Sequence, residues 1–446
     1  MPTLVKYAIM TRPILTSIAF LFALNATAQS FYFPPKTGST WDTVSPASLG
    51  WCEDSIPQLL QNLDATNSKA FIVLKDGKIV IEAYFDGFTK DSIWYWASAG
   101  KSLTAFLVGL AQEQGYLNID NKTSDYLGTG WSSAPSVKED SITVWHQLTM
   151  TTGFDDGLGN ADCTLDSCLV YLADAGTRWA YHNAPYTLLD SVMEAATGRS
   201  LNLFLNQQLQ SKTGMTGAYV QVDYNNVHFS IPRSMARFGL LALNKGKWDQ
   251  TVVMNDTAFF NAMTNTSQNI NLSYGYLWWL NGKASYRLPQ TQFTFTGSAV
   301  PNAPADMFAA LGKNGQIINV VPSKGLVVVR MGDAPGTSYF VPNSYNDSIW
   351  LWLNPVLNCA PTAISKVPIK IAPKLYPNPA SGMVTVLLPD ASGGNMVLFS
   401  LMGERVLKLA LTGYNTIIDV VNVPKGVYLY QVESNGNFYN GKLIVE

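Results

Sequence analysis

The chain has 446 residues, enough for two or three domains of ordinary size, or for one large α/β domain with a small additional module. Hydrophobic residues make up 47% and aromatic residues 12% of the sequence, which excludes a globally disordered chain. Lysine and arginine number 29 against 31 aspartates and glutamates, so no basic surplus exists and we expect no nucleic-acid partner. Charged residues make up only 13%, about half the usual share, a composition that we associate with exported proteins.

The first 28 residues have the features of a secretory signal peptide. Lys6 and Arg12 are basic, residues 14–24 are apolar, and residues 26–28 read Ala-Thr-Ala, a small-residue cleavage site. The apolar run is shorter than the roughly 20 residues that span a bilayer, although an uncleaved anchor stays an alternative. We therefore predict export, with no transmembrane segment after the signal is removed.

Hydrophobic periodicity and turn residues divide the rest of the chain into an enzyme-sized body over residues 46–359 and a small C-terminal module. An exposed lead-in (29–45) precedes the body. The elements expected in the body are a helical region (46–66), a hairpin (70–85), a helix-rich stretch to about residue 265, strands at 274–279, 316–321 and 326–331, and a closing helix at 345–357. Strands at both ends around a helical insert indicate a mixed α/β fold.

Residues 360–372 are linker-like, and residues 373–446 contain short apolar runs at regular spacing. The strands expected there are 384–388, 397–401, 405–411, 416–421, 426–432 and 437–445. This pattern is typical of a small all-β sandwich.

Four cysteines fit an oxidising compartment. Cys163 and Cys168 are five positions apart, a spacing that can close a local loop, whereas Cys52 and Cys359 are far apart in the chain. A metal site is a rival interpretation, but the sequence has no CxxC motif and only three histidines. We therefore expect neither a metal nor a cofactor.

Ser98 and Lys101 form the first candidate catalytic pair. They are three positions apart at the start of an apolar, helix-like run, so their side chains share one helical face. A serine hydroxyl needs a base to become a nucleophile, and a desolvated lysine can be that base as a neutral amine.

Tyr181 and Asn183 form the second candidate pair, two positions apart on an expected extended turn. A tyrosine can relay protons, and an asparagine can hold a carbonyl group. A Ser-His-Asp arrangement that uses His182 is an alternative, although no G-x-S-x-G motif surrounds Ser98.

The third candidate is the glycine-rich segment that begins at Gly312, just before an apolar strand. A glycine at a strand edge lets a substrate approach the backbone closely, and a backbone N–H there can stabilise an oxyanion together with that of Ser98. An ordinary glycine-rich hairpin turn is the alternative explanation.

The order Ser98-x-x-Lys101, Tyr181-x-Asn183, Gly312 resembles the serine β-lactamase-related hydrolases, and the class C-type branch in particular, over roughly residues 46–357. That branch includes β-lactamases, carboxylesterases, D-amino-acid peptidases and aminohexanoate-dimer hydrolases. The resemblance implies a β-lactamase/transpeptidase-like fold, in which an antiparallel sheet is flanked by helices and joined to a helical subdomain.

The resemblance also implies a role for each candidate residue. Ser98 is expected to be acylated, and Lys101 and Tyr181 to share the general-base and general-acid roles. Asn183 is expected to bind the substrate carbonyl. Gly312 is expected to be the glycine of the third motif, with the Lys313 backbone N–H completing the oxyanion site.

The third motif departs from the pattern of many β-lactam-recognising members, which carry Lys-Thr-Gly or His-Thr-Gly there. In this chain Ala310 and Leu311 precede Gly312, although Thr296-Gly297 is a rival alignment. Without a cation, recognition of a carboxylate beside the scissile bond is weakened. We therefore expect an esterase or amidase for a small ester or amide substrate. The alternatives are a β-lactamase, a D-amino-acid peptidase, or a slowly turning-over sensor of β-lactams or peptidoglycan.

In this family the N- and C-terminal helices of the body pack side by side and antiparallel. The resemblance therefore implies a disulfide between Cys52, which opens the first of these helices, and Cys359, which follows the second.

Residues 373–446 resemble the type A sorting domain of Bacteroidota type IX secretion. The likeness rests on the segments 375–380, 398–403 and 423–430 and on the ending 441–446. It implies the type IX machinery as a partner, and a secreted or outer-membrane surface location in a Gram-negative, Bacteroidota-like bacterium. A carbohydrate-binding or adhesion sandwich is the alternative.

Overall fold

The computed structural model describes residues 31–336, 341–359, 372–388 and 393–446. The predicted signal peptide and nearly all of the predicted linker lie outside the described residues.

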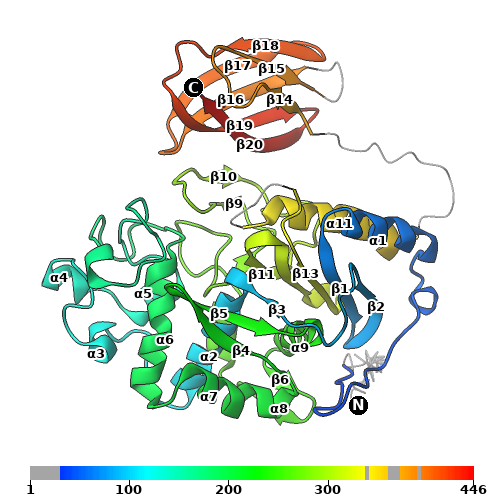
Figure 1. Cartoon of the computed structure of the whole chain (residues 1–446), viewed down its shortest axis with the longest axis vertical. Helices are drawn as coiled ribbons and strands as arrows, with labels where there is room; N and C mark the ends of the chain where they lie inside the picture. The colour runs from blue at the N-terminus through cyan, green and yellow to red at the C-terminus, as the bar shows by residue number, and fades with distance from the viewer. Residues whose placement is uncertain (1–30, 337–340, 360–371, 389–392) are drawn as a thin grey trace, which may run out of the picture. The chain divides into compact units, whose positions relative to one another are not determined.

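The body is built on a six-stranded antiparallel sheet with the strand order β2-β1-β13-β12-β11-β8 (Figure 1). The strands are β1 (Ser68–Lys75), β2 (Lys78–Tyr84), β8 (Trp279–Leu280), β11 (Phe308–Gly312), β12 (Gln316–Val321) and β13 (Leu326–Gly332). The three central strands are buried along their whole length, because helices cover both faces of the sheet. This explains why their sequences are continuous apolar runs.

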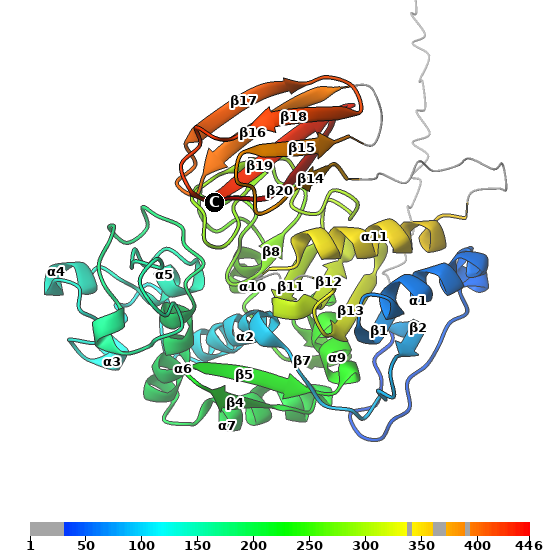
Figure 2. The same cartoon turned by 45° about the horizontal axis from the view of Figure 1, so that its top comes forward.

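Helices lie on both sides of this sheet (Figure 2). On one side α1 (Ile56–Asp64) packs against α11 (Asn343–Leu357), and on the other α9 (Pro232–Leu243) packs on β12 and β13. The helix α2 (Gly100–Glu113) contacts β11 and buries twelve of its fourteen residues. A helix that is apolar on nearly every side must be enclosed by other elements, so α2 is the inner helix of the body.

The remaining elements of the body form the helical subdomain and small sheets. The helices are α3 (Ser124–Leu127), α4 (Ser136–Glu139), α5 (Val144–Leu148), α6 (Asn183–Thr197), α7 (Leu201–Leu205), α8 (Ser211–Thr213) and α10 (Thr257–Met263). The small sheets comprise β3 (Trp94–Tyr95) with β5 (Asn225–Ser230) and β4 (Ala218–Val222), β6 (Lys247–Trp248) with β7 (Thr251–Val252), and β9 (Ser285–Tyr286) with β10 (Phe295–Thr296).

Two disulfides are present, Cys52–Cys359 and Cys163–Cys168. The first joins the start of the α1 region to the end of α11, and the Cys52 N–H also donates to the Val356 carbonyl at 2.8 Å. The Cys52–Cys359 disulfide therefore joins the two ends of the body, which are 307 positions apart in the chain.

The C-terminal module has two antiparallel sheets and a hydrophobic core of its own. One sheet has the order β14-β15-β18 and the other β17-β16-β19-β20. The strands are β14 (Lys374–Tyr376), β15 (Met383–Leu387), β16 (Gly394–Ser400), β17 (Arg405–Leu411), β18 (Asn415–Asp419), β19 (Gly426–Ser434) and β20 (Asn437–Val445). Buried and more exposed positions alternate along most of them, which is the arrangement of a sandwich.

The structure confirms the hairpin, the strands at 316–321 and 326–331, and the closing helix, but not a strand over 274–279. There the chain doubles back on itself: Tyr274 forms an isolated bridge with Trp279, and Leu277 has a φ of 58°. Only Trp279–Leu280 joins the sheet. In the region 46–66, the α-helix begins only at Ile56, and two short 3-10 turns precede it.

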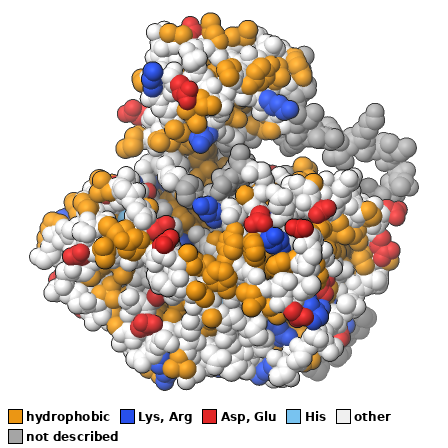
Figure 3. Space-filling view, in the orientation of Figure 1, with side chains coloured by type: hydrophobic (Ala, Val, Ile, Leu, Met, Phe, Trp, Pro, Cys, Tyr) orange, Lys and Arg blue, Asp and Glu red, His pale blue; other side chains and the backbone are white. Residues whose placement is uncertain are grey.

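The surface reflects the low charge content of the sequence. On the face of the molecule in Figure 3, charged side chains are scattered among uncharged and apolar ones. None of the helices in the described part of the chain combines the length and the apolarity needed to cross a membrane.

Candidate active site

Ser98 lies in a strained turn at the entrance to α2. It is the middle residue of the 3-10 turn Ala97–Ala99, and Ala97 has a φ of 46°, which residues with a β-carbon rarely adopt. Trp96 anchors the turn: its side chain is fully buried, its N–H donates to the His228 carbonyl, and its indole donates to Ser230. Strain of this kind persists only where the surroundings enforce it, and it is frequent at functional sites.

Lys101 stands one helical turn beyond Ser98 and points back to it. Its Nζ donates to Ser98 Oγ at 3.2 Å, and the side chain is only 4% exposed. Burial lowers the pKa of Lys101 to about 7, although the nearby carboxylates of Asp162 and Asp190 raise it. Near neutral pH the amine is therefore unprotonated in a large fraction of the molecules, and an unprotonated amine can accept the serine proton.

Aromatic rings enclose the ammonium group of Lys101. Its Nζ lies 4.0 Å from the centroid of the Tyr186 ring and 5.4 Å from that of Tyr181. Lys101 makes no ion pair with any described residue. A buried cation gains less from ring faces than it loses with its water of hydration. The rings therefore do not restore the ordinary pKa of Lys101.

Tyr181 lies close to Ser98, and this interaction lowers the pKa of the Tyr181 phenol in part. Burial is the larger effect, and it raises the pKa of Tyr181 far above its ordinary value. The ring is stacked on Trp279, with centroids 5.6 Å apart and planes inclined by 29°. The structure thus brings Ser98, Lys101 and Tyr181 together, with the serine hydroxyl beside an amine and a phenol.

Asn183 is the first residue of α6 and lies two positions after Tyr181 in the chain. Its Nδ2 donates to Asp162 Oδ1 at 2.6 Å, and its Oδ1 is buried without a partner. The expected extended turn is therefore a helix start, and the amide is already engaged by an aspartate that sequence reasoning missed.

Gly312 ends β11 directly against the Ser98 turn. A β-carbon at this position would lie 2.4 Å from the Trp96 carbonyl oxygen and 3.1 Å from the Ser98 nitrogen. Only glycine allows this approach, which favours Gly312 over the rival Gly297. Gly297 instead follows β10 of a separate two-stranded sheet, and a β-carbon there would meet no atom within 4 Å. Lys313 comes next and its side chain is exposed.

A Ser-His-Asp arrangement that uses His182 receives no support from the geometry. His182 is buried, its Nδ1 has no partner, and the base that contacts Ser98 is Lys101. In the part of the chain that the structure describes, no three His, Cys, Asp or Glu side chains are gathered as metal ligands.

Two further residues of the site escaped sequence reasoning, Tyr186 and Asp190. Both lie on α6, three and seven positions after Asn183, so they share its helical face. Burial raises the pKa of Asp190 to about 7, and Asn226 donates to its carboxylate at 2.9 Å. An acidic residue on the buried face of an apolar helix was the signal in the sequence that could have identified Asp190.

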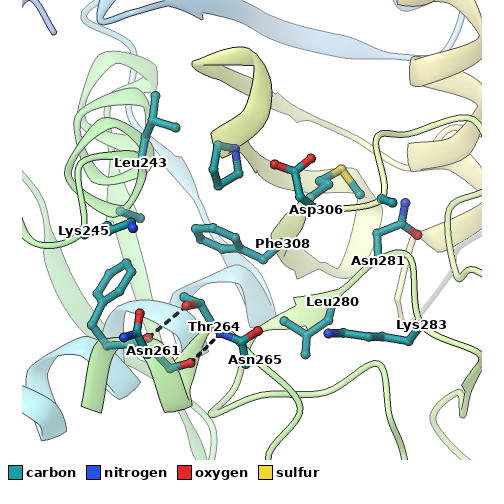
Figure 4. Close-up of a pocket in the computed structure, with 15 residues that line it drawn as sticks. Leu243, Lys245, Asn261, Thr264, Asn265, Leu280, Asn281, Lys283, Asp306 and Phe308 are labelled. Atoms are coloured by element: carbon teal, nitrogen blue, oxygen red, sulfur yellow. Dashed lines mark hydrogen bonds between the residues drawn. The ribbon is translucent and has the colours of Figure 1, made fainter. Parts of the chain in front are cut away.

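A separate hollow of about 370 Å³ lies at the other end of β11, around Phe308 (Figure 4). Its lining has both apolar side chains and polar ones, such as Lys245, Asn261 and Asp306, but no serine, cysteine or histidine. Because it offers no nucleophile paired with a base, we place the candidate active site at Ser98 and not here.

Residues 56–346 match the family model described as Beta-lactamase, which covers about two thirds of the chain. The chain therefore belongs to the β-lactamase family and is a serine hydrolase. Residues 374–446 match the model of the secretion system C-terminal sorting domain, so the protein carries a type IX sorting signal and is secreted or displayed on the cell surface.

The chain is distantly similar to several known proteins. An uncharacterised protein from Alkalihalophilus pseudofirmus is 23% identical over 323 residues, which cover 64% of this chain and 88% of that protein. A family VIII carboxylesterase structure has a TM-score of 0.53 and 13% identity, covering 72% of this chain and 99% of the other. A Bacillus anthracis structure assigned as a 6-aminohexanoate-dimer hydrolase has a TM-score of 0.52 and 16% identity, with 72% and 89% coverage. At these identities, the structural likenesses establish the fold.

We expect Gly312→Ala to disrupt the Ser98 turn, because the new methyl group would overlap the Trp96 carbonyl oxygen. Overpacking of this kind costs about 1–3 kcal/mol, and displacement of the turn should also lower kcat by at least about tenfold. Thermal melting and turnover of a p-nitrophenyl ester measure both effects.

Gly100→Ala is the matched control for Gly312→Ala. A β-carbon at position 100 would meet His228 Cβ at 3.5 Å, an ordinary contact, so stability should stay the same or rise. Equal melting temperatures and kcat values for the two variants would show that the close approach of Gly312 to the Ser98 turn matters neither for stability nor for turnover.

Proposed function

We propose that the protein cleaves a small ester or amide through an acyl-enzyme on Ser98. The observation that carries this proposal is the contact of 3.2 Å between Lys101 Nζ and Ser98 Oγ, made by a lysine whose burial lowers its pKa to about 7. A serine paired in this way with a neutral amine has the base that it needs for nucleophilic attack.

In the acylation step, Lys101 accepts the proton of Ser98 as the serine oxygen bonds to the substrate carbonyl carbon. The electron pair of the carbonyl moves to its oxygen, where the backbone N–H groups of Ser98 and Lys313 stabilise the negative charge. Tyr181 gives a proton to the leaving alcohol or amine as the bond to the carbonyl carbon breaks, and the proton held by Lys101 restores the phenol. Lys101 and Tyr181 belong to the same small site, since Lys101 Nζ lies 5.4 Å from the centroid of the Tyr181 ring.

In the deacylation step, a water molecule attacks the carbonyl carbon of the acyl-enzyme and loses its proton to the pair formed by Lys101 and Tyr181. The bond from the carbonyl carbon to Ser98 breaks, and the serine oxygen regains a proton. The products are a carboxylic acid and the free enzyme, so no cofactor enters the balance.

The residues that precede Gly312 on β11 support an ester or amide as the substrate class over a β-lactam. Ala310 and Leu311, which precede Gly312, are both apolar and at most 1% exposed. They offer no charge to a substrate carboxylate, and a site that lacks this partner discriminates less in favour of β-lactams.

Ser98→Ala should abolish turnover of p-nitrophenyl acetate and covalent labelling by a fluorophosphonate serine probe, because the atom that is acylated is removed. A loss of several orders of magnitude in kcat is expected, as for members of a catalytic unit. Mass spectrometry locates the label and spectrophotometry follows the release of nitrophenolate.

Ser102→Ala is the matched control, since this serine lies in the first turn of α2, close in the chain to Ser98, and donates to the Leu277 carbonyl. It should keep both labelling and turnover. An adduct on Ser98 that persists without release of free enzyme would indicate a sensor, and unchanged labelling of the Ser98→Ala protein would contradict the proposal.

The value of kcat/KM should rise with pH and reach half of its maximum near pH 7, because only unprotonated Lys101 accepts the serine proton. Burial lowers the pKa of Lys101 in the folded enzyme to about 7, so activity is lost as the pH falls below this value. A pH profile of p-nitrophenyl acetate hydrolysis between about pH 5 and 9 measures the midpoint.

The variant Asp190→Asn tests the origin of this midpoint. The Asp190 charge raises the pKa of Lys101, so its removal should move the midpoint to lower pH. A midpoint that stays near 7 in Asp190→Asn contradicts the influence of Asp190 on Lys101, whereas a wild-type profile that is flat through this range contradicts the assignment of Lys101 as the base.

We expect short acyl esters to have a higher kcat/KM than a chromogenic cephalosporin, because no buried cation stands before Gly312 to bind the cephalosporin carboxylate. Steady-state kinetics on a panel of p-nitrophenyl esters, D-amino-acid amides and β-lactams make the comparison. A clear preference for the cephalosporin would overturn the assignment of an esterase or amidase.

We infer that the C-terminal module directs the enzyme across the outer membrane, after which it is released or attached to the cell surface. A chain truncated from Pro373 should accumulate in the periplasm, whereas the full chain should reach the medium or the outer surface. Enzyme assays on the cell fractions measure the distribution. Equal export of both chains would instead favour an adhesion or carbohydrate-binding role for the module.

A further inference from the structure

Asp162 lies beside Asn183 and directly precedes the loop that the Cys163–Cys168 disulfide closes. The Asp162 N–H donates to the side chain of Asn160, and the Ala161 carbonyl accepts from the N–H of Ala184 in the first turn of α6. The loop is therefore tied both to itself and to the helix that carries Asn183. Asp162 is half-buried, so its carboxylate is fixed in place and still accessible.

The Asp162 carboxylate determines which way the amide of Asn183 points. A carboxylate only accepts hydrogen bonds, so the Asn183 atom at 2.6 Å from Asp162 Oδ1 is the nitrogen. The Asn183 oxygen then points elsewhere, and it is buried without a donor. This side of the site therefore presents acceptors, and Asn183 has fewer amide hydrogens left for an incoming carbonyl or carboxylate.

The negative charge of Asp162 has no cationic partner in the reactive state. No described lysine or arginine makes an ion pair with it, and the nearby Arg178 pairs with Asp156. Lys101 is close enough for the Asp162 charge to raise its pKa, but it must be neutral to accept the serine proton. An acceptor-rich, partly desolvated site with an unbalanced negative charge favours a cation and repels a carboxylate.

We propose that Asp162 is a specificity-determining residue, which makes the Ser98 site select esters and amides that carry a cationic group, such as an ammonium, in the acyl portion beside the reacting carbonyl. This inference rests on the proposed function and narrows its substrate class. It also gives a second reason, independent of Ala310 and Leu311, for weak recognition of carboxylate-bearing β-lactams.

Two p-nitrophenyl esters of matched shape test this inference. One has a butanoyl chain that ends in trimethylammonium, and the other is its isostere, in which carbon replaces the nitrogen. Because the charge of the first does not depend on pH, titration of Lys101 affects both esters equally. At low ionic strength the wild-type kcat/KM should favour the cationic ester by roughly tenfold, which corresponds to one modest charge interaction.

Asp162→Asn should bring the ratio of the two kcat/KM values close to one. The asparagine oxygen can still accept the hydrogen bond from Asn183, so the amide should keep its position, and any change in Lys101 affects both esters equally and cancels in the ratio. Asp166→Asn is the matched control, because Asp166 is an exposed aspartate in the adjacent disulfide loop. It removes the same charge four positions away and should leave the ratio unchanged.

A wild-type ratio near one, or an equal fall in kcat/KM for both esters in Asp162→Asn, would overturn the inference and leave Asp162 a structural role alone. A melting temperature for each variant separates loss of fold from loss of selectivity. Failure of the proposed function has a different signature, which is wild-type inactivity on both esters or activity that survives Ser98→Ala.

Discussion

The desolvation of Lys101 is the constraint on which the rest of the site depends. An ammonium group in water has a pKa of 10.5, and burial in this protein lowers it to about 7. This shift corresponds to about 5 kcal/mol of differential stabilisation, which the folded chain must supply from other interactions at pH values below 7. The penalty disappears as the pH rises towards 10.5, because the unfolded chain then also loses its proton. The protein thus gives up stability in order to hold a basic amine beside Ser98.

The fold supplies what this amine requires. The inner position of α2 buries the lysine, and the turn at Ala97 directs Ser98 back to it. Tyr186 on α6 and Tyr181 just before that helix bring the aromatic rings that cover the amine. The close approach of Gly312 places the end of β11 against the same turn. These contributions come from segments more than 200 positions apart, and the Cys52–Cys359 bond joins the chain on both sides of them. The site is therefore a product of the whole body, although its first two residues are three positions apart.

The sequence predicted those parts of the site that depend on local spacing. Ser98 and Lys101 are three positions apart, so their spacing alone places them together, whereas Gly312 had Gly297 as a rival and is favoured only by its close approach to the Ser98 turn. The role of Asp162 could not be predicted from the sequence, because its contact with Asn183 depends on how a loop without periodic structure folds. The strand expected over 274–279 failed for a similar reason, since its apolar residues are buried by a chain reversal at Leu277 and not by a sheet. Periodicity shows which residues are buried, but not which element buries them.

Charged residues make up only 13% of the sequence. The proposed selectivity of the site therefore depends on a small number of charged side chains. The proposed mechanism requires Lys101 to be unprotonated near neutral pH, and NMR measures this directly. In protein labelled with carbon-13 lysine, the Lys101 side-chain resonance, identified by its absence in Lys101→Arg, should titrate with a midpoint near pH 7. A midpoint near the ordinary value of 10.5 would contradict this role, because the lysine would then be a cation that cannot accept the serine proton.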